Sequence, residues 1–318
     1  MLILITLSFN KLTAQDPVYS QFMFNQPYFN PANAGMKDNP RINGSYRNQW
    51  PGVGKSFISY NVSYDQFAEK IGGGIGFNIS RDIQGQGVFS GTRINIMYSY
   101  PVSVTKHLNV NLGFQAGLTQ NSTVVSGLLL PDDNPFMPGT SEQLTNQSSM
   151  YPDFSTGATF RYKEQYEANI CVDHLNVIKR QSTGQSNYFI LPTRVSIEIS
   201  TQYPAKMPAK QKIAIFHTGI MTQVQQSYVY LNYGGNISYS SFLVGFWLRN
   251  DLKFKINTFI FLAGYSWEGL SLVYTYDLWV PKTNQQFNFF GSHEVTFEYI
   301  FKYNDPKKKM RALKCPIF

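Results

Sequence analysis

Residues that could do chemistry are few in this sequence and form no recognisable motif. The four histidines lie far apart, without the short spacings typical of a metal site: His107, His174, His217 and His293. A G-x-S-x-G nucleophile motif is missing, and no pair of carboxylates has a spacing that predicts acid–base catalysis. We therefore expect a protein that is not an enzyme and that has no catalytic residue, cofactor-binding residue or metal ligand.

The run of residues 72–76, Gly-Gly-Gly-Ile-Gly, has the glycine content of a phosphate-binding loop. The lysine and the helical pattern that complete such a loop do not follow it. It leads instead into a segment of alternating residues, so we interpret it as a tight turn before a strand.

The segment that would position any site is a β-strand of transmembrane length. In Leu108–Leu118 every second residue is apolar, and the residues between them are Asn, Gly or Gln. An extended backbone places the apolar residues on one face and the polar residues on the other. About eleven residues of this kind are enough to cross a bilayer as a tilted strand.

The same alternation recurs along the chain and predicts about fourteen strands. They lie near residues 41–48, 56–66, 71–80, 91–101, 108–118, 153–162, 166–174, 193–203, 211–222, 227–236, 241–249, 254–264, 269–278 and 292–303. In several of them the charged residues fall on the polar face. The predicted fold is all-β, a transmembrane antiparallel β-barrel with an apolar face toward lipid and a polar face toward the lumen.

Composition agrees with a barrel and leaves one alternative open. Charged residues make up 14% of the chain and aromatic residues 16%, with 21 Tyr and 25 Phe. Aromatic residues gather at the two membrane interfaces of a barrel, while half of each strand stays polar. A soluble, tyrosine-rich β-sandwich has a similar composition. It has no reason, however, to place its long connections on one side, and the longer predicted connections (81–90, 119–152, 175–192, 279–291) all leave the same end of the strands.

The predicted barrel comprises residues 41–303, and three further segments lie outside it. Residues 1–15 have the apolar run of a signal peptide, with an ordinary buried strand as the alternative. Residues 16–40 contain several prolines among aromatic residues, and we expect an irregular plug or a pad beneath the rim rather than a disordered leader. Residues 304–318 are a basic tail, which an even strand number places in the periplasm. The net charge of +8 partly reflects this tail and does not predict nucleic-acid binding.

Candidate partner-binding residues come from the long connections and from the tail. The connections carry apolar residues that a solvated loop rarely exposes, namely Leu128, Leu129, Leu130, Phe136, Tyr188, Phe189, Phe289 and Phe290. The tail combines basic residues with an apolar end, namely Lys307, Lys308, Lys309, Arg311, Ile317 and Phe318. We expect the first group to contact a secreted protein and the second to dock on a periplasmic partner; a merely solvated tail is the alternative.

Several stretches together resemble the PorP/SprF family of outer-membrane proteins of the type IX secretion system. They are Gln15-Asp16-Pro17 with Tyr19 to Gln26, Asn30-Pro31-Ala32-Asn33-Ala34-Gly35, Tyr46-Arg47-Asn48-Gln49-Trp50-Pro51-Gly52, Gly291-Ser292-His293-Glu294 and Lys314-Cys315-Pro316-Ile317-Phe318. They span the mature chain from end to end, and residues 119–152 resemble nothing family-wide.

The resemblance implies a barrel in the outer membrane of a Gram-negative bacterium that works with the secretion and gliding apparatus. It implies that the protein retains, or helps to export, a surface adhesin bearing a C-terminal sorting domain, alongside other type IX components and outer-membrane lipid. The residues alone leave a second function open, because a solute porin needs the same barrel.

Overall fold

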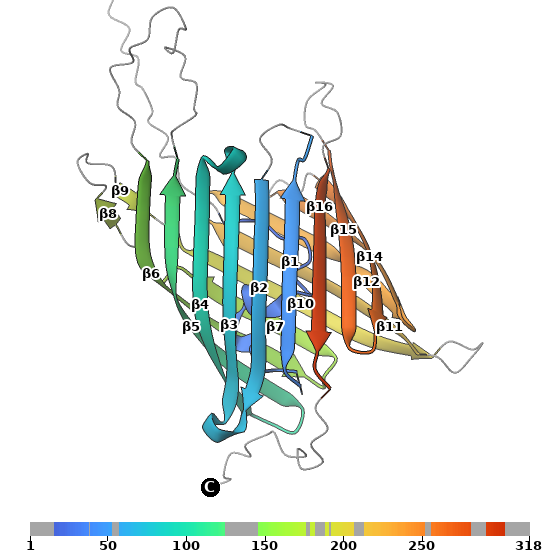
Figure 1. Ribbon diagram of the computed structural model, residues 1–318. Coiled ribbons are helices and arrows are strands. Elements are labelled where there is room, and N and C mark those ends of the chain that lie inside the picture. Colours follow the sequence, from blue (N-terminus) through green and yellow to red (C-terminus); the bar gives the residue numbers. More distant parts are fainter. Residues whose placement is uncertain are drawn as a thin grey trace, which may run out of the picture.

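The structure is a computed structural model of the 318-residue chain. It describes residues 16–37, 39–52, 57–124, 146–175, 179–181, 188–190, 192–206, 213–251, 256–280 and 291–302. In these ranges the chain forms one closed antiparallel barrel of fourteen strands together with a separate two-stranded sheet (Figure 1). The sequence-based prediction of a fourteen-stranded antiparallel barrel is confirmed.

The barrel strands follow one another around the wall, and the first pairs with the last. Their bounds are β1 Arg41–Gln49, β2 Phe57–Ala68, β3 Gly73–Gln84, β4 Phe89–Ser103, β5 Leu108–Thr123, β6 Gln147–Tyr162, β7 Tyr166–Asp173, β10 Arg194–Lys206, β11 Ile213–Gln225, β12 Tyr228–Tyr239, β13 Phe242–Asp251, β14 Ile256–Trp267, β15 Leu270–Trp279 and β16 Ser292–Ile300. The separate sheet pairs β8, Lys179–Gln181, with β9, Tyr188–Ile190.

Helical structure in the described residues is short. It consists of α1 Gln26–Phe29 and three 3₁₀ turns, η1 Pro31–Asn33, η2 Glu69–Ile71 and η3 Gly85–Gly87. Among the described residues, none of these pieces has the length and apolar composition of a membrane-crossing helix.

Alternation along each strand separates an outer apolar surface from an inner polar one. On β5, Leu112, Phe114 and Leu118 are each about half exposed, whereas Thr119 is fully buried. The exposed apolar side chains stand on the outer face, which suits lipid rather than water. The inward-facing rows carry the Asn, Ser, Thr, Arg, Asp and Glu side chains that are buried within the barrel.

The two ends of the barrel differ, and we name them by their residues. Arg41 pairs with Ile300, so β1 begins and β16 ends at the same end, the turn end. At the other end Gln49 pairs with Ser292, and we name it the loop end. The strands β1 and β16 lie side by side in Figure 1, so the closing seam is continuous along their length.

The wall is taller on one side at the loop end. The strands β5 and β6 stay paired as far as Thr123 and Gln147. The neighbouring strand β7 already ends at Asp173, which pairs with Arg194, the first residue of β10. The same Arg194 pairs with Gln225, the last residue of β11, so these three residues share the last rung of the low wall.

Candidate functional site: the filled lumen

The N-terminal segment, residues 16–37, runs through the barrel lumen from one end toward the other. Its first residue, Asp16, donates its backbone N–H to Gln225 on the last rung of the low wall. Near its other end, the N–H of Gly35 donates to Asp65 at 2.8 Å, and Asp65 also pairs with Arg41 at the start of β1. The segment therefore spans the lumen from the loop end to the turn end before the chain enters the wall.

Aromatic side chains of this segment pack on an apolar patch of the inner wall. The aromatic cluster consists of Tyr19, Phe22, Tyr28 and Phe29 of the segment with Met221, Trp247 and Ile260 of the wall. Phe22 meets Trp247 edge to face with ring centroids 5.2 Å apart. Burying an aromatic or aliphatic side chain of this size contributes about 1.5–3 kcal/mol, so hydrophobic contact is a main force that holds the segment.

On β3 and β5, glycines face the lumen where the backbone of the segment lies against the wall. A Cβ atom at Gly113 would overlap the backbone of Ala32, and one at Gly74 would overlap the carbonyl of Ala34. Gly35 lies against Gly74 with a φ of 65°, a conformation that favours glycine. The wall has therefore no room for side chains at these positions while the segment is in place.

The side chain of Asn30 fastens the middle of the segment to two strands. Its amide nitrogen donates to the carbonyl of Ala158 on β6 at 3.2 Å and to Asn169 on β7 at 3.3 Å. Its amide oxygen accepts from the N–H of Ala32 at 2.9 Å and so caps η1. One side chain thus shapes the segment and attaches it to the wall.

A second attachment lies where the barrel closes, and we name it the seam cluster. It consists of Ser20, Gln21, Arg47, Arg249, Asp277 and Glu294. Glu294 accepts from the backbone N–H groups of Ser20 and Gln21 at 2.7 and 3.0 Å. Arg47 pairs with Asp277 at 2.8 Å and with Glu294 at 2.9 Å. Two guanidinium groups therefore balance two carboxylates between β1, β13, β15 and β16.

A third attachment surrounds Asp16, and we name it the loop-end cluster. It consists of Asp16, Arg93, Asp153, Asp173, His174, Arg194 and Gln225. One oxygen of Asp16 pairs with Arg93, and the other accepts from His174 Nε2 at 2.7 Å and from Gln225 Nε2 at 3.0 Å. The other ring nitrogen of His174 lies 2.7 Å from Asp153.

Charge in the loop-end cluster is balanced only when His174 is protonated. A ring nitrogen can bond a carboxylate only by donating a proton, and both ring nitrogens of His174 face carboxylates. The protonated ring joins Arg93 and Arg194 to give three positive charges against the carboxylates of Asp16, Asp153 and Asp173.

The pKa values of the two groups outside the strands agree with this pairing. Burial alone would raise the pKa of Asp16, but Arg93, His174 and Arg194 outweigh it and hold that pKa well below its usual value. His174 follows directly after the last residue of β7. Burial acts to lower the pKa of His174, whereas Asp16 and Asp153 raise it, to a result of about 9.

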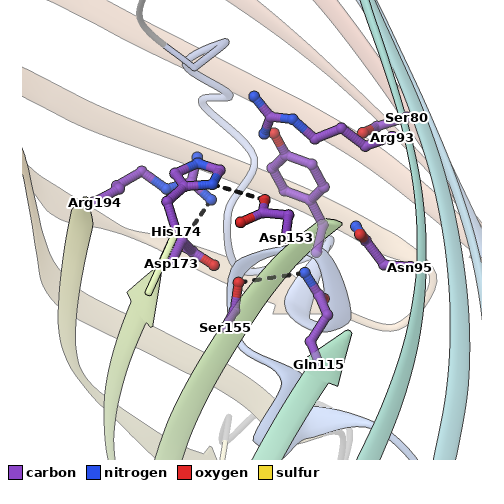
Figure 2. Close-up of a pocket in the computed structure, with 10 residues that line it drawn as sticks. Ser80, Arg93, Asn95, Gln115, Asp153, Ser155, Asp173, His174 and Arg194 are labelled. Atoms are coloured by element: carbon purple, nitrogen blue, oxygen red, sulfur yellow. Dashed lines mark hydrogen bonds and ion pairs between the residues drawn. The ribbon is translucent and has the colours of Figure 1, made fainter. Parts of the chain in front are cut away.

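Next to this cluster lies a small polar cavity of about 10 Å³ (Figure 2). Its lining includes Asp153, Asn95 and Tyr28, and in each of these side chains a buried oxygen has no hydrogen-bond partner in the described structure. A cavity of this volume holds about one water molecule, which could satisfy these oxygens. Figure 2 shows the pair between His174 and Asp153 at the side of the cavity.

In the part of the chain that the structure describes, no three His, Cys, Asp or Glu side chains are grouped as metal ligands. The carboxylates of Asp153 and Asp16 bond the two opposite ring nitrogens of His174, as ion pairs do.

Most residues predicted to bind partners lie outside the described residues. This holds for Leu128, Leu129, Leu130, Phe136, Phe289, Phe290, Lys307, Lys308, Lys309, Arg311, Ile317 and Phe318. Tyr188 and Phe189 belong to β9, which pairs with β8 outside the barrel sheet. Their roles remain predictions.

Sequence reasoning missed the residues that hold the N-terminal segment. The sequence nevertheless marks two of these residues, because the alternation of apolar and polar residues fails around them. Three consecutive residues are apolar in Phe246-Trp247-Leu248 and again in Phe259-Ile260-Phe261. The middle residue of each run faces inward and is almost fully buried in the aromatic cluster. An apolar residue on a polar lumen face predicts a packing partner inside the barrel.

Comparison with known proteins identifies the family. The sequence model described as type IX secretion system membrane protein PorP/SprF matches residues 11–299. The family resemblance predicted from the sequence motifs is confirmed. Among curated proteins, none matches the sequence of this chain.

Solved structures share the fold at low sequence identity. A FadL homologue from Pseudomonas aeruginosa is 10% identical, with 88% of this chain and 94% of that chain covered and a TM-score of 0.51. The CymD monoaromatic hydrocarbon channel is 11% identical, with 89% and 94% covered and a TM-score of 0.49. At 10% identity the likeness to the FadL homologue concerns the fold alone.

The seam cluster predicts a large cost for removing Arg47. In Arg47→Met the buried carboxylates of Asp277 and Glu294 lose their main counter-charge, and we expect the free energy of unfolding to fall by about 3–5 kcal/mol. Urea unfolding in phospholipid vesicles measures this loss. The matched control is Arg161→Met, since the pair between Arg161 and Glu167 is partly exposed and should contribute below about 1 kcal/mol. Equal losses in the two variants would contradict the role of the seam cluster.

The loop-end cluster predicts a pH dependence that belongs to His174. Its folded pKa of about 9 lies above the unfolded value near 6.5, so the stabilisation is fully present below about pH 6.5 and is lost as the pH rises through 9. We expect His174→Gln to lower the free energy of unfolding at pH 6.5 by about 3 kcal/mol at most and to flatten its change between pH 6.5 and 9. The control is His107→Gln, at an exposed turn residue, which should keep the wild-type profile.

Proposed function

Because the chain belongs to the PorP/SprF family of type IX secretion membrane proteins, we propose that it retains, or helps to export, a surface adhesin bearing a C-terminal sorting domain. It acts as a non-enzymatic barrel in the outer membrane of a Gram-negative bacterium. It works beside other secretion components, as the family resemblance implies.

The observation that carries this proposal is the filled lumen. A solute porin needs a continuous aqueous path, whereas here residues 16–37 pass through the barrel and are attached at both ends and in the middle. Buried aromatic contacts and charge pairs hold the segment, so an open pore needs its displacement. An attachment role needs no such opening, and we therefore favour it over solute transport.

We assign the contact between this protein and the adhesin to the long connections at the loop end. We place the loop end at the cell surface and the turn end in the periplasm, because barrels of this kind have short periplasmic turns. In the described strands the turn-end connection between β6 and β7 has three residues and that between β12 and β13 has two. We infer that the predicted connections 119–152, 175–192 and 279–291 contact the adhesin, and that residues 304–318 dock on a periplasmic partner.

The filled lumen predicts that the wild-type protein conducts poorly. Purified protein in a planar bilayer should show no large, steady pore, whereas the pair Gly74→Ala and Gly113→Ala should produce open-pore steps, because the added Cβ atoms exclude the N-terminal segment. The matched control is Gly91→Ala, where the nearest atom to a Cβ is the side-chain oxygen of Asn121 at 3.1 Å. A steady pore in wild type would favour the porin and remove the main support for an anchor.

The partner assignment predicts that barrel insertion and adhesin display can be separated. Shortening residues 125–145, 182–190 and 281–290 together should leave the barrel in the membrane but release proteins with sorting domains from the surface of intact cells. Deleting residues 310–318 should have the same effect through the periplasmic side. Mass spectrometry of peptides released by protease from intact cells measures display, and heat-modifiable migration of the barrel measures insertion. Unchanged display in both variants would exclude these contacts.

A further inference from the structure

Side chains of the barrel surround the carboxylate of Asp16 with hydrogen-bond donors, and we name these side chains the receptor. Each oxygen of the Asp16 carboxylate meets its own donors: Arg93 on one side, and His174 with Gln225 on the other. Arg194 adds a contact of 3.4 Å from its guanidinium. These donors come from three strands and from the residue after β7, so the wall positions them independently of the segment.

Charge makes the receptor incomplete without an anion. When Asp16 is removed, Arg93 and Arg194 face the carboxylates of Asp153 and Asp173, and His174 keeps one of its two carboxylate partners, Asp153. With His174 protonated, the net charge of the emptied site is +1, and its members other than Arg93 are more than nine-tenths buried. An unpaired buried charge is strongly unfavourable, so the emptied site attracts an anion.

The shape of the site favours a carboxylate over a simple halide. Its donors are arranged around two oxygen atoms, and guanidinium groups match planar carboxylates well. Unpartnered oxygens of Asn95 and Asp153, both more than nine-tenths buried, line the adjoining cavity and can accept hydrogen bonds from a neighbouring peptide N–H or a water.

Asp16 can leave without the rest of the segment. Between Asp16 and the seam cluster, Pro17 and Val18 are only half-buried, and a proline has no N–H to anchor. The next attachments are Tyr19, which packs in the aromatic cluster, and Ser20, whose N–H donates to Glu294. Withdrawal of residues 16–18 therefore leaves the seam cluster and the aromatic cluster in place.

The site also lies at the loop end of the low wall. Arg194 and Gln225 share the last rung of the low wall, and His174 follows the end of β7. A peptide that enters from the loop end reaches this level without displacing the aromatic cluster.

We propose that Arg93, His174, Arg194 and Gln225 form a carboxylate-binding site that Asp16 fills in the resting chain and that a carboxylate of an incoming extended peptide takes over. Asp16 then acts as an internal competitor, and peptide binding releases the start of the N-terminal segment. The site is independent of the adhesin role proposed above, because its chemistry is fixed by the wall.

Chemical rescue tests the receptor in the purified full-length protein. In Asp16→Ala, 100 mM sodium acetate should raise the unfolding temperature by at least about 2 °C over the same concentration of sodium chloride, and neutral acetamide should not. Wild type, in which Asp16 fills the site, should respond alike to acetate and chloride. An equal response of Asp16→Ala to acetate, acetamide and chloride would overturn the proposal.

Peptide exchange tests the competition and does not require Asp16→Ala to fold. In Val18→Cys, made in a Cys315→Ser background, maleimide labelling should become several-fold faster when a peptide with the sequence of residues 16–22 and an amidated end is added. The same peptide with Asn in place of Asp should have no effect. The Asn peptide with a free C-terminus distinguishes a terminal carboxylate from a side-chain carboxylate as the ligand. Labelling that no carboxylate-bearing peptide accelerates would show that Asp16 is a fixed anchor and would overturn the exchange.

Discussion

Charged side chains that point into this barrel must find their counter-charges inside it, because the N-terminal segment takes the place of the water that would otherwise solvate them. The seam cluster meets this constraint with two guanidinium groups and two carboxylates, and the loop-end cluster meets it with three charges of each sign. At the turn end Arg41 and Asp65, each about 1% exposed, pair at 2.9 Å. The seam cluster and the pair of Arg41 with Asp65 are balanced within the wall, whereas the loop-end cluster takes one of its negative charges, Asp16, from the segment.

The same constraint explains why opposite parts of the wall differ in composition. The strands β11, β13 and β14 offer Met221, Trp247 and Ile260 to the aromatic side chains of the segment, although an aqueous lumen would call for polar residues there. The strands β3 and β5 offer glycine, because the backbone of the segment lies directly on them. The segment therefore meets apolar side chains on one part of the wall and bare backbone on the other.

Strand order and number could be predicted because the period-two pattern is local, whereas the contents of the lumen could not. The predicted strand boundaries left out some strand residues. Alternation predicted a strand over residues 108–118, but β5 continues to Thr123. Residues 119–123, Thr-Gln-Asn-Ser-Thr, are polar on both faces, so no pattern marks them as strand. Arg93 and Asp277 could be placed on the inner face from the sequence, but their partners Asp16 and Arg47 lie 77 and 230 residues away. No spacing rule connects residues that meet only after the barrel has closed.

Three of the motifs that carry the family resemblance are far apart in the sequence and meet at one place in the structure. Ser20 belongs to the first motif, Arg47 to a later one and Glu294 to the start of the last strand. Arg47 donates to the Ser20 hydroxyl at 3.0 Å and to Glu294 at 2.9 Å, while Glu294 accepts the Ser20 N–H at 2.7 Å. Glu294 binds the segment through the backbone N–H groups of Ser20 and Gln21. The seam cluster therefore restricts the residue types at positions 47 and 294 more strictly than the residue types of the segment. The loop-end cluster is the reverse case, because the Asp16 carboxylate itself is the group recognised. The seam cluster therefore depends on the backbone path of the segment, whereas the loop-end cluster depends on the single side chain of Asp16. For this reason only the loop-end cluster can exchange its bound group for another carboxylate.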